Sequence, residues 1–498
     1  MPASSRLSAV ENDSKPAYPN NPALTVPVSV ISGCKAIMRA MSDRVIVVGG
    51  GLAGVEAAAQ IAKRGVRVVL FEMRPKVMTP AHRTDRLAEL VCSSSLKSNS
   101  PTTAHGLLKE EMRRLGSIVL DCAARSAVPG GDALCVDRDK FAELVTSEIE
   151  REPLIDVVRE EVIQIPAERP CVIATGPLTS PALCESIAEL TGAHNLHFFD
   201  AIAPSVEAES IDMSKVFRQS RYDKGEAAYL NCPMSREQYE AFIDALLTAE
   251  VAHLHLEEER DPRFFEGCLP VEVVARRGRN ALAYGTMKPV GLRDPRTGKR
   301  PYAVVQLRQE NAEASVYGLV GFQTQLRPSE QERVFRMIPG LQNARFVRYG
   351  QVHRNTYIDS PNVLTPALHT LVDKGLYFAG QLVGVEGYVE SAATGILAGI
   401  NAARVALGEE PVVAPTQTMI GALADYVANC PVSHFQPMNS NFGILPPLEG
   451  CHPKKISKQL NIDRARTHMD AFVRTLSECE RTNSSSTGAG DSSHRLET

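Results

Sequence analysis

The sequence contains no tryptophan among its 498 residues, and aromatic side chains make up only 5% of it. Positive charge is not in excess either, because 54 Lys and Arg residues stand against 58 Asp and Glu, a formal net charge of −4. This balance excludes a nucleic-acid-binding protein whose whole surface is basic, so any contact with RNA must be confined to one region. The hydrophobic fraction of 44% is ordinary for an α/β protein, and the length predicts two or three domains.

Closely spaced cysteine pairs are absent as well. The eleven cysteines are scattered without C-x-x-C spacing, and no signal-peptide segment is recognisable. This pattern indicates a reduced, cytoplasmic compartment and argues against a zinc ribbon and a generic disulfide reductase; we predict no metal site. Residues 45–62 are nearly uncharged, but Glu56 and four glycines interrupt them, so we expect no membrane span.

The strongest pattern lies at residues 44–72. An apolar run, Val45 to Val48, is followed by Gly49-x-Gly51-x-x-Gly54, a run of small residues at helical spacing, and a second apolar run that ends in Glu72. This order is typical of a βαβ unit that binds a dinucleotide, because the glycines permit a tight turn, the approach of a pyrophosphate and close packing of helix on strand. Glu72 is placed to accept a hydrogen bond from a ribose hydroxyl. We therefore predict a cofactor site at Gly49, Gly50, Gly51, Leu52, Ala53, Gly54 and Glu72.

Two later segments also read as a strand that ends in a glycine-containing turn. Residues 172–177 read as a strand that stops on a Thr-Gly-Pro turn, although that turn alone is weak evidence. Residues 375–381 read as a strand ending in Gly-Gln, and a helix of small residues follows at 391–403. The second segment favours FAD over a transient nicotinamide and predicts an α/β, FAD-binding Rossmann-like fold of the two-dinucleotide type. The residues expected near the cofactor here are Thr175, Gly176, Gly380 and Gln381.

From about residue 201 to 350 the pattern changes to short strand-like runs with one helix near 236–249, which predicts an inserted α+β domain. The helical stripes at 104–120 and 139–150 are expected to pack on the first sheet. The expected divisions are a disordered extension at 1–41, the first part of the FAD-binding domain at 42–200, the inserted domain at 201–350, the second part with C-terminal helices at 351–475, and a disordered tail at 476–498. Met41 is a candidate functional start, and a transit peptide is the weaker alternative.

Arginines cluster in the inserted region. Arg276, Arg277 and Arg279 lie together, and residues 293–300 hold a second concentration of cations. Cations on turns of an otherwise acidic chain are candidates for contacts with a phosphate backbone. A solvated surface is the commoner meaning of such runs.

Two cysteines lie in unusual surroundings. Cys92 is followed by three serines, a lysine and an asparagine, so hydroxyl donors and a nearby cation could stabilise its thiolate; the alternative is a small buried residue beside a helix N-cap. Cys268 lies on a Gly-Cys turn between Glu266 and Glu272, whose charges would disfavour a thiolate. On local grounds alone, a buried structural cysteine is the simpler interpretation of Cys268.

Taken in order, these motifs resemble one bacterial family, the folate- and FAD-dependent tRNA uracil-C5-methyltransferases. The resemblance runs from about Met41 to about residue 475, and the N-terminal extension is a departure from the family. The motifs are the glycine-rich loop at Gly49, Glu-Leu-Val-Cys-Ser at Cys92, Thr-Gly-Pro at Thr175, Phe-Glu-Gly-Cys at Cys268, Val-His-Arg-Asn-Thr at His353 and Phe-Ala-Gly-Gln at Gly380.

The resemblance implies that NADH or NADPH reduces FAD, that 5,10-methylenetetrahydrofolate supplies the carbon, and that the T-loop uridine of tRNA becomes ribothymidine. It implies that Cys268 is the nucleophile at C6 of the uracil and that Cys92 is the base or protects the flavin as an adduct. The tRNA side would involve Arg276, Arg277, Arg279, His353 and Arg354, and no obligate protein partner is expected. The alternatives are the related flavoprotein that modifies the wobble uridine with a GTPase partner, and a non-catalytic module that binds flavin or tRNA.

Overall fold

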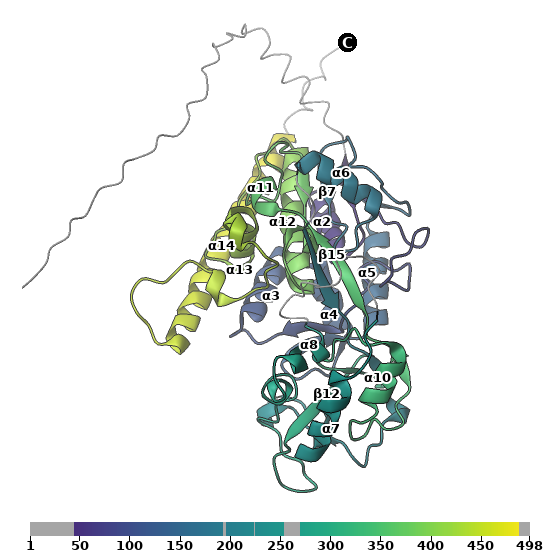
Figure 1. Cartoon of the computed structure of the whole chain (residues 1–498). Coiled ribbons are helices and arrows are strands. Elements are labelled where there is room, and N and C mark those ends of the chain that lie inside the picture. Colours follow the sequence, from purple (N-terminus) through teal and green to yellow (C-terminus); the bar gives the residue numbers. More distant parts are fainter. Residues whose placement is uncertain (1–43, 193–195, 224, 253–268, 488–498) are drawn as a thin grey trace, which may run out of the picture. The chain divides into compact units, whose positions relative to one another are not determined.

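The computed structural model describes residues 44–192, 196–223, 225–252 and 269–487, shown in colour in Figure 1. The extension at 1–41 and Cys268 therefore lie outside the described residues. Within the described ranges, no helix is both long and apolar enough to cross a membrane.

A sheet of five parallel strands forms the centre of the fold, in the order β16-β7-β1-β2-β6. In the register of β1, Val47 lies opposite Leu70 of β2 and Val172 of β7. Strands β7 and β16 are buried throughout, which explains why they read as uninterrupted apolar runs in the sequence. The strands are β1 (Arg44–Val48), β2 (Arg67–Phe71), β6 (Ile155–Val158), β7 (Cys171–Ile173) and β16 (Leu376–Phe378).

Two helices of small residues, α2 (Leu52–Lys63) and α12 (Tyr388–Ala406), lie against each other, as Figure 1 shows. A Cβ atom at Gly395 would lie 2.2 Å from the carbonyl oxygen of Ala53, and one at Gly399 would lie 2.6 Å from that of Ala57. Only glycine allows backbones to approach this closely. The packing therefore fixes the start of α12 beside the glycine-rich turn that precedes α2.

A second sheet, antiparallel and six-stranded, has the order β10-β11-β12-β13-β9-β14. Its helices α7, α8 and α10 lie together with β12 in Figure 1, and its buried apolar residues form a cluster of their own. The antiparallel pair β8 (Leu196–Ala201) and β15 (Val352–Tyr357) leads the chain into and out of this region. The remaining elements are β9 (Ser205–Glu207), β10 (Phe217–Arg218), β11 (Tyr229–Met234), β12 (Ala303–Gln309), β13 (Val316–Leu319), β14 (Phe346–Arg348), α7 (Arg236–Leu247), α8 (Val271–Arg276), α9 (Ala281–Tyr284) and α10 (Pro328–Phe335).

The helical stripe expected at 104–120 is two helices. The first, α3 (Ala104–Leu115), ends at Gly116, which adopts a left-handed conformation (φ 79°). The second, α4 (Ile118–Arg125), starts after Ser117, whose side chain accepts a hydrogen bond from the Leu120 amide. Other elements here are β3 (Ser95–Ser98), β4 (Ala127–Val128), β5 (Ala133–Val136), α5 (Arg138–Arg151), α6 (Pro181–Thr191), α11 (Ser360–Val363), the 3₁₀ turn η6 (Gly380–Val383) and α13 (Met419–Asn429).

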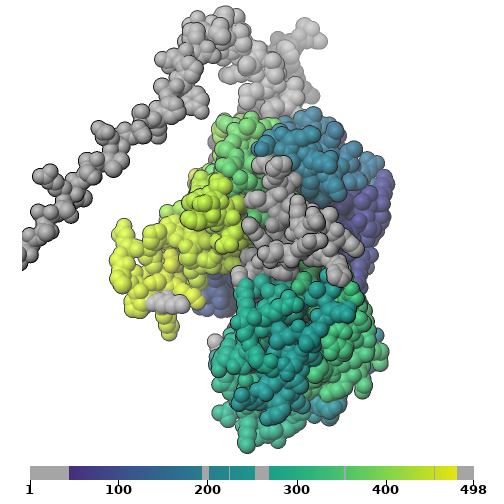
Figure 2. All heavy atoms as spheres, viewed as in Figure 1, coloured from purple at the N-terminus to yellow at the C-terminus, as the bar shows by residue number. Residues whose placement is uncertain are grey.

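The C-terminal helix α14 (Lys454–Thr487) is longer than expected, because it continues through residues 476–487, which the sequence predicted to be disordered. Its buried residues follow a spacing of three and four that packs the helix on the rest of the core: Ile462, Ala465, Met469, Phe472 and Leu476. Once a helix is anchored in this way, each residue added to its end forms one more backbone hydrogen bond. The helix can therefore continue even through a serine-rich sequence. In Figure 2 the part of the chain from α13 to residue 478 forms the yellow region of the surface.

The start of α13 is held by a buried carboxyl group. Glu111 on α3 accepts hydrogen bonds from the backbone amides of Met419 and Ile420, at 2.8 and 2.9 Å. Burial raises the pKa of Glu111 to about 8, although these amides act in the opposite direction. The native protein therefore retains this proton to a higher pH than the unfolded chain does, so stability falls as the pH rises from about 4.5 to about 8.

Glu111→Gln is expected to remove this part of the pH dependence. Between about pH 5 and pH 8, the midpoint of thermal unfolding of the wild type should fall by a few degrees relative to that of the variant. The variant should also have a free energy of unfolding that is lower by a constant amount at every pH, because the amide oxygen of glutamine can accept only one of the two hydrogen bonds. Thermal unfolding across a pH series checks this, with Glu189→Gln on the exposed side of α6 as the matched control. Parallel curves for the wild type and Glu111→Gln would contradict the expectation.

Candidate functional site

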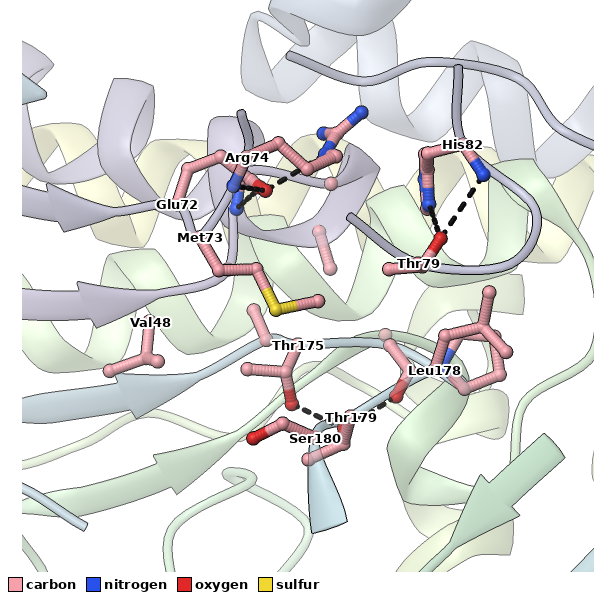
Figure 3. Close-up of a pocket in the computed structure, with 18 of the residues that line it drawn as sticks. Val48, Glu72, Met73, Arg74, Thr79, His82, Thr175, Leu178, Thr179 and Ser180 are labelled. Carbon is pink, nitrogen blue, oxygen red and sulfur yellow. Dashed lines mark hydrogen bonds and ion pairs between the residues drawn. The ribbon is translucent and has the colours of Figure 1, made fainter. Parts of the chain in front are cut away.

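A cavity of about 1030 Å³, counting its open mouth, lies at the carboxyl ends of the central strands. Parallel α/β sheets bind ligands at this edge. Figure 3 shows Glu72 and Arg74 on one side of the cavity and Thr175, Thr179 and Ser180 on the other. The lining includes ten of the eleven cofactor residues expected from the sequence, all but Gly54: Gly49, Gly50, Gly51, Leu52, Ala53, Glu72, Thr175, Gly176, Gly380 and Gln381.

The glycines of the first turn have separate physical roles. Gly49 has a φ of 105°, and a Cβ atom there would lie 2.6 Å from the carbonyl oxygen of Ala174. A Cβ atom at Gly54 would lie 1.7 Å from the carbonyl oxygen of Gly49, so this position must be glycine for the helix to pack on the turn. A Cβ atom at Gly51 would meet no atom within 4 Å, and Gly51 caps α2 without a side-chain acceptor. The turn thus leaves open space in front of a helix N-terminus, an arrangement that suits a pyrophosphate.

Glu72 is buried and makes more contacts than the sequence indicated. Its carboxylate accepts from the Gly50 amide at 2.9 Å and pairs with Arg74 at 2.8 Å. Burial alone would raise the pKa of Glu72, but the hydrogen bond and charge of Arg74 outweigh it, so the pKa is lowered. The carboxylate is therefore ionised and held rigidly. A carboxylate can accept about four hydrogen bonds, so capacity is left for a ribose hydroxyl.

The two later cofactor segments reach the same cavity. The Thr175 hydroxyl lies 2.6 Å from that of Thr179. The amide of Gly380, which has a φ of 81°, donates to the hydroxyl of Thr394 at 2.8 Å. The side-chain amide of Gln381 donates to Glu386 at 2.8 Å. Residues 175, 176, 380 and 381, far apart in the sequence, are therefore brought together with residues 49–54, because β7 lies beside β1 and β16 lies beside β7.

A second cavity of about 1360 Å³ adjoins the first. The two share Val91, Pro177, Leu178, Gln381 and Tyr388 as lining residues. Residues that line only the second cavity come from β3 and the segment before it, from the six-stranded sheet and from β15; they include Cys92, Lys97, Arg308, Glu310 and Asn355.

Cys92 is half-buried on the wall of this second cavity and is not in a disulfide. Its backbone amide donates to the hydroxyl of Tyr388 at 2.7 Å, and the amide of Ser93 donates to the same hydroxyl at 3.1 Å. No helix starts here, since the next one, α3, begins at Ala104, and this removes the alternative of a residue beside a helix N-cap. Burial raises the pKa of the Tyr388 phenol, so this hydroxyl stays protonated at neutral pH.

Residues that sequence reasoning missed surround Cys92. Arg308 donates to the Ser93 hydroxyl at 2.6 Å, and Arg348 donates to the carbonyl oxygen of Val91 at 2.9 Å. Tyr388 lay inside a segment interpreted only as a loop before a helix. The sequence offers no signal for these three residues, because each contacts the Cys92 segment from more than 200 positions away.

The three arginines expected on the tRNA side lie apart from the described walls of the two cavities. Arg276, Arg277 and Arg279 are exposed at the end of α8, and Arg279 pairs with Asp244 at 2.7 Å. His353 and Arg354 are in β15, where their backbones pair with Asp200 and Phe199 of β8.

Cys268 falls outside the described residues, but the chain that follows it is well defined. Glu272, in the first turn of α8, is buried and accepts from the Thr324 hydroxyl at 2.9 Å and the Gln325 amide at 2.8 Å. Burial raises the pKa of Glu272 despite these hydrogen bonds. Its carboxylate is thus engaged within the second sheet's own core region.

Comparison with known proteins agrees with this geometry. The profile of the family described as "Glucose inhibited division protein A" matches residues 44–410. The solved structure of Aquifex aeolicus GidA has a TM-score of 0.61 at 17% identity, covering 87% of this chain and 75% of that one. This likeness confirms the FAD-binding Rossmann-like fold with an inserted domain.

Closer relatives share more than half of their residues with this chain. The Lactobacillus acidophilus protein named "Methylenetetrahydrofolate--tRNA-(uracil-5-)-methyltransferase TrmFO" is 55% identical over 437 residues, 87% of this chain and 99% of that protein. The Pelotomaculum thermopropionicum protein of the same name is 57% identical over 433 residues, with the same coverage. The chain therefore belongs to the GidA family and, within it, to the methylenetetrahydrofolate--tRNA-(uracil-5-)-methyltransferases named TrmFO.

Proposed function

We propose that this chain methylates C5 of the T-loop uridine of tRNA to give ribothymidine, with 5,10-methylenetetrahydrofolate as carbon donor and reduced FAD as reductant. The observation that carries the proposal is the junction of the two cavities, because the cavity that contains Cys92 shares Gln381 and Tyr388 with the dinucleotide cavity. A thiol beside a flavin site suits a reaction that needs both a base and a reductant. The names of relatives at 55–57% identity describe the same transfer.

FAD fits the first cavity on three observations. Gly51 leaves open space where a side chain would stand, α2 begins without a capping side chain, and the ionised Glu72 keeps acceptor capacity. The residues proposed to hold FAD are Gly49, Gly50, Gly51, Leu52, Ala53, Gly54, Glu72, Thr175, Gly176, Gly380 and Gln381. When bound and reduced by NADH or NADPH, FAD supplies the hydride that completes the methyl group.

The two cysteines are proposed to supply the remaining chemistry. C5 of uracil is a poor nucleophile until a thiolate, here Cys268, forms a bond to C6 and moves an electron pair onto C5. C5 then attacks the methylene carbon of the folate, and the bond from that carbon to one of the two nitrogens it bridges breaks, its electron pair staying on that nitrogen. Cys92 takes the C5 proton as a base, and the electron pair of the broken C–H bond forms a double bond to the methylene carbon and expels the second folate nitrogen. The Cys268 thiolate leaves C6 once the methyl group is complete.

The inserted region, 201–350, is proposed as the tRNA side of the molecule. Arg276, Arg277 and Arg279 are exposed cations at the end of α8, and His353 and Arg354 lie in the strand that joins this region to the FAD-binding part. Phosphate contacts need such cations but carry no sequence information. We expect a cytoplasmic location and no obligate protein partner.

The names of the relatives separate this proposal from the wobble-uridine alternative. The proteins that are 55–57% identical to this chain, over 87% of it, are named as methyltransferases of the uracil-5 position of tRNA. A non-catalytic module would have no use for a half-buried cysteine on the wall that adjoins the flavin site.

One assay tests the proposed function. The purified protein should be yellow and, given NADPH and methylenetetrahydrofolate, should convert the T-loop uridine of an unmodified tRNA transcript to ribothymidine. A transcript with cytidine at that position is the matched control and should give no product. Absence of product from the uridine transcript, or modification of its wobble uridine instead, would refute the proposal.

A further inference from the structure

Three arginines surround one buried carboxylate beside Cys92. Glu310 pairs with Arg138 of α5, lies 3.9 Å from Arg348 of β14, and accepts from the Ser205 hydroxyl at 2.7 Å. Arg308, two positions before Glu310, lines the Cys92 cavity. The carboxylate needs a glycine opposite it, because a Cβ atom at Gly318 would lie 2.3 Å from Oε1 of Glu310.

The same arginines hold the Cys92 segment on both sides. Arg348 Nη1 donates to the carbonyl oxygen of Val91 at 2.9 Å, and Arg308 Nη2 donates to the Ser93 hydroxyl at 2.6 Å. Both belong to the six-stranded sheet, whereas Cys92 precedes β3 in the FAD-binding part. The position of Cys92 is therefore set by the inserted region as well as by the FAD-binding part to which Cys92 belongs.

Positive charge is in excess at this point. Burial opposes the ionisation of Glu310, but Arg138 and Arg348 outweigh it and lower its pKa. Burial and the neighbouring charge of Arg138 lower the pKa of Arg348 to about 10, so it remains protonated at neutral pH. The Glu310 carboxylate thus stands against three guanidinium groups. The Nε atoms of Arg308 and Arg348 are also buried without a hydrogen-bond partner among the described residues, a costly arrangement outside a functional site.

We propose that Arg308 and Arg348 are positioning residues, which orient the Cys92 segment and supply the positive charge that stabilises the Cys92 thiolate. Opposite charge at short range favours the ionised form of a thiol. Among the residues that the structure describes, the other ionisable groups that border the cysteine segment and its cavity are Arg138 of α5, Glu310 after β12, Lys97 of β3, Tyr388 of α12 and Glu386 just before α12. The role of these arginines in catalysis rests on the proposed function, but their stabilisation of the Cys92 thiolate does not.

The test is the pH profile of Cys92 alkylation by iodoacetamide in the FAD-bound protein. Cys92 is the only cysteine in the tryptic peptide Leu87–Lys97, so mass spectrometry follows it separately from the other ten. In Arg348→Met and Arg308→Met, the profile should move to higher pH, and alkylation at neutral pH should slow about tenfold. Arg348→Lys keeps the positive charge but loses the planar guanidinium group with its several N–H donors. It should therefore shift the pH profile less than Arg348→Met does.

Arg345→Met is the matched control, because this exposed arginine pairs with Glu207 at the surface and should leave the profile unchanged. An unmoved profile in both methionine variants would overturn the proposal, and so would a change confined to the limiting rate at high pH, which indicates altered access alone. If the profile shifts but Cys92→Ala keeps full methylation activity, the assignment of Cys92 as the catalytic base fails while the arginine role stands.

Discussion

Cys268→Ala is expected to abolish covalent capture of a T-loop RNA that carries 5-fluorouridine. Addition of the thiolate to C6 and transfer of the carbon to C5 can still occur on this analogue, but fluorine cannot leave as the proton does, so the protein–RNA bond persists in the wild type. Without the sulfur, that bond cannot form. Product formation on ordinary tRNA should fall on the order of 10⁴-fold. Gel retardation under denaturing conditions measures the capture, and a timed assay measures the turnover.

Two further variants make this result specific. Cys92→Ala should still form the bond to C6 yet lose turnover, because the base is missing and the nucleophile is not. Cys451→Ala changes an exposed cysteine and should behave as the wild type. If Cys268→Ala still captured the RNA, the nucleophile would have to be another residue, and Cys92 would be the first to examine.

Gly54→Ala is expected to yield a colourless, destabilised protein. Its methyl group would lie 1.7 Å from the carbonyl oxygen of Gly49, so the turn and α2 must separate. Gly51→Ala should act differently, because its backbone (φ −78°) suits any residue and its methyl group meets no protein atom within 4 Å. That variant should fold normally and lose FAD affinity by tenfold or more, since only a ligand can occupy the space its methyl takes.

The comparison is made by flavin absorbance for binding and by thermal unfolding of the FAD-free protein for the fold. Gly278→Ala is the matched control, because its added methyl also meets no atom within 4 Å but lies outside both cavities. Full FAD affinity in Gly51→Ala would contradict the placement of the pyrophosphate in front of α2.

Much of the dinucleotide site could be predicted from the sequence because its parts are local. The strand, the glycine turn and the helix follow one another within 44–63, and Gly49 and Gly54 are required by backbone atoms that the same unit or the end of its neighbouring strand supplies. The two later segments could be added because each repeats the pattern of a strand that ends in glycine. Periodicity and turn chemistry are short-range signals, and these features are short-range.

The surroundings of Cys92 could not be predicted in the same way. Tyr388, Arg308 and Arg348 contact the segment 91–93 across separations of 296, 215 and 257 positions. No periodicity marks such pairs, since they depend on how the six-stranded sheet meets the FAD-binding part. The arginines that the sequence pattern indicated, at 276–279, are exposed and are not among the residues that contact the Cys92 segment.

Two local interpretations also missed a competing interaction. Glu72 was expected to accept a hydrogen bond from a ribose hydroxyl, and no protein partner was expected for it. In the structure Arg74, two residues later, pairs with Glu72 and keeps its carboxylate ionised. The serine-rich end of α14 was expected to be disordered, but the buried stripe from Ile462 to Leu476 anchors the helix that runs on to Thr487. A neighbouring side chain in the first case, and tertiary packing in the second, decides a feature that composition left open.

The origin of the methyl carbon tests the central claim most directly. Purified protein, NADPH and an unmodified tRNA transcript would be incubated with methylenetetrahydrofolate labelled with carbon-13 in the methylene group, in the presence of unlabelled S-adenosylmethionine, and the nucleosides analysed by mass spectrometry. We expect ribothymidine whose C5 methyl carries the label. Ribothymidine with an unlabelled methyl group, or none at all, would contradict the account.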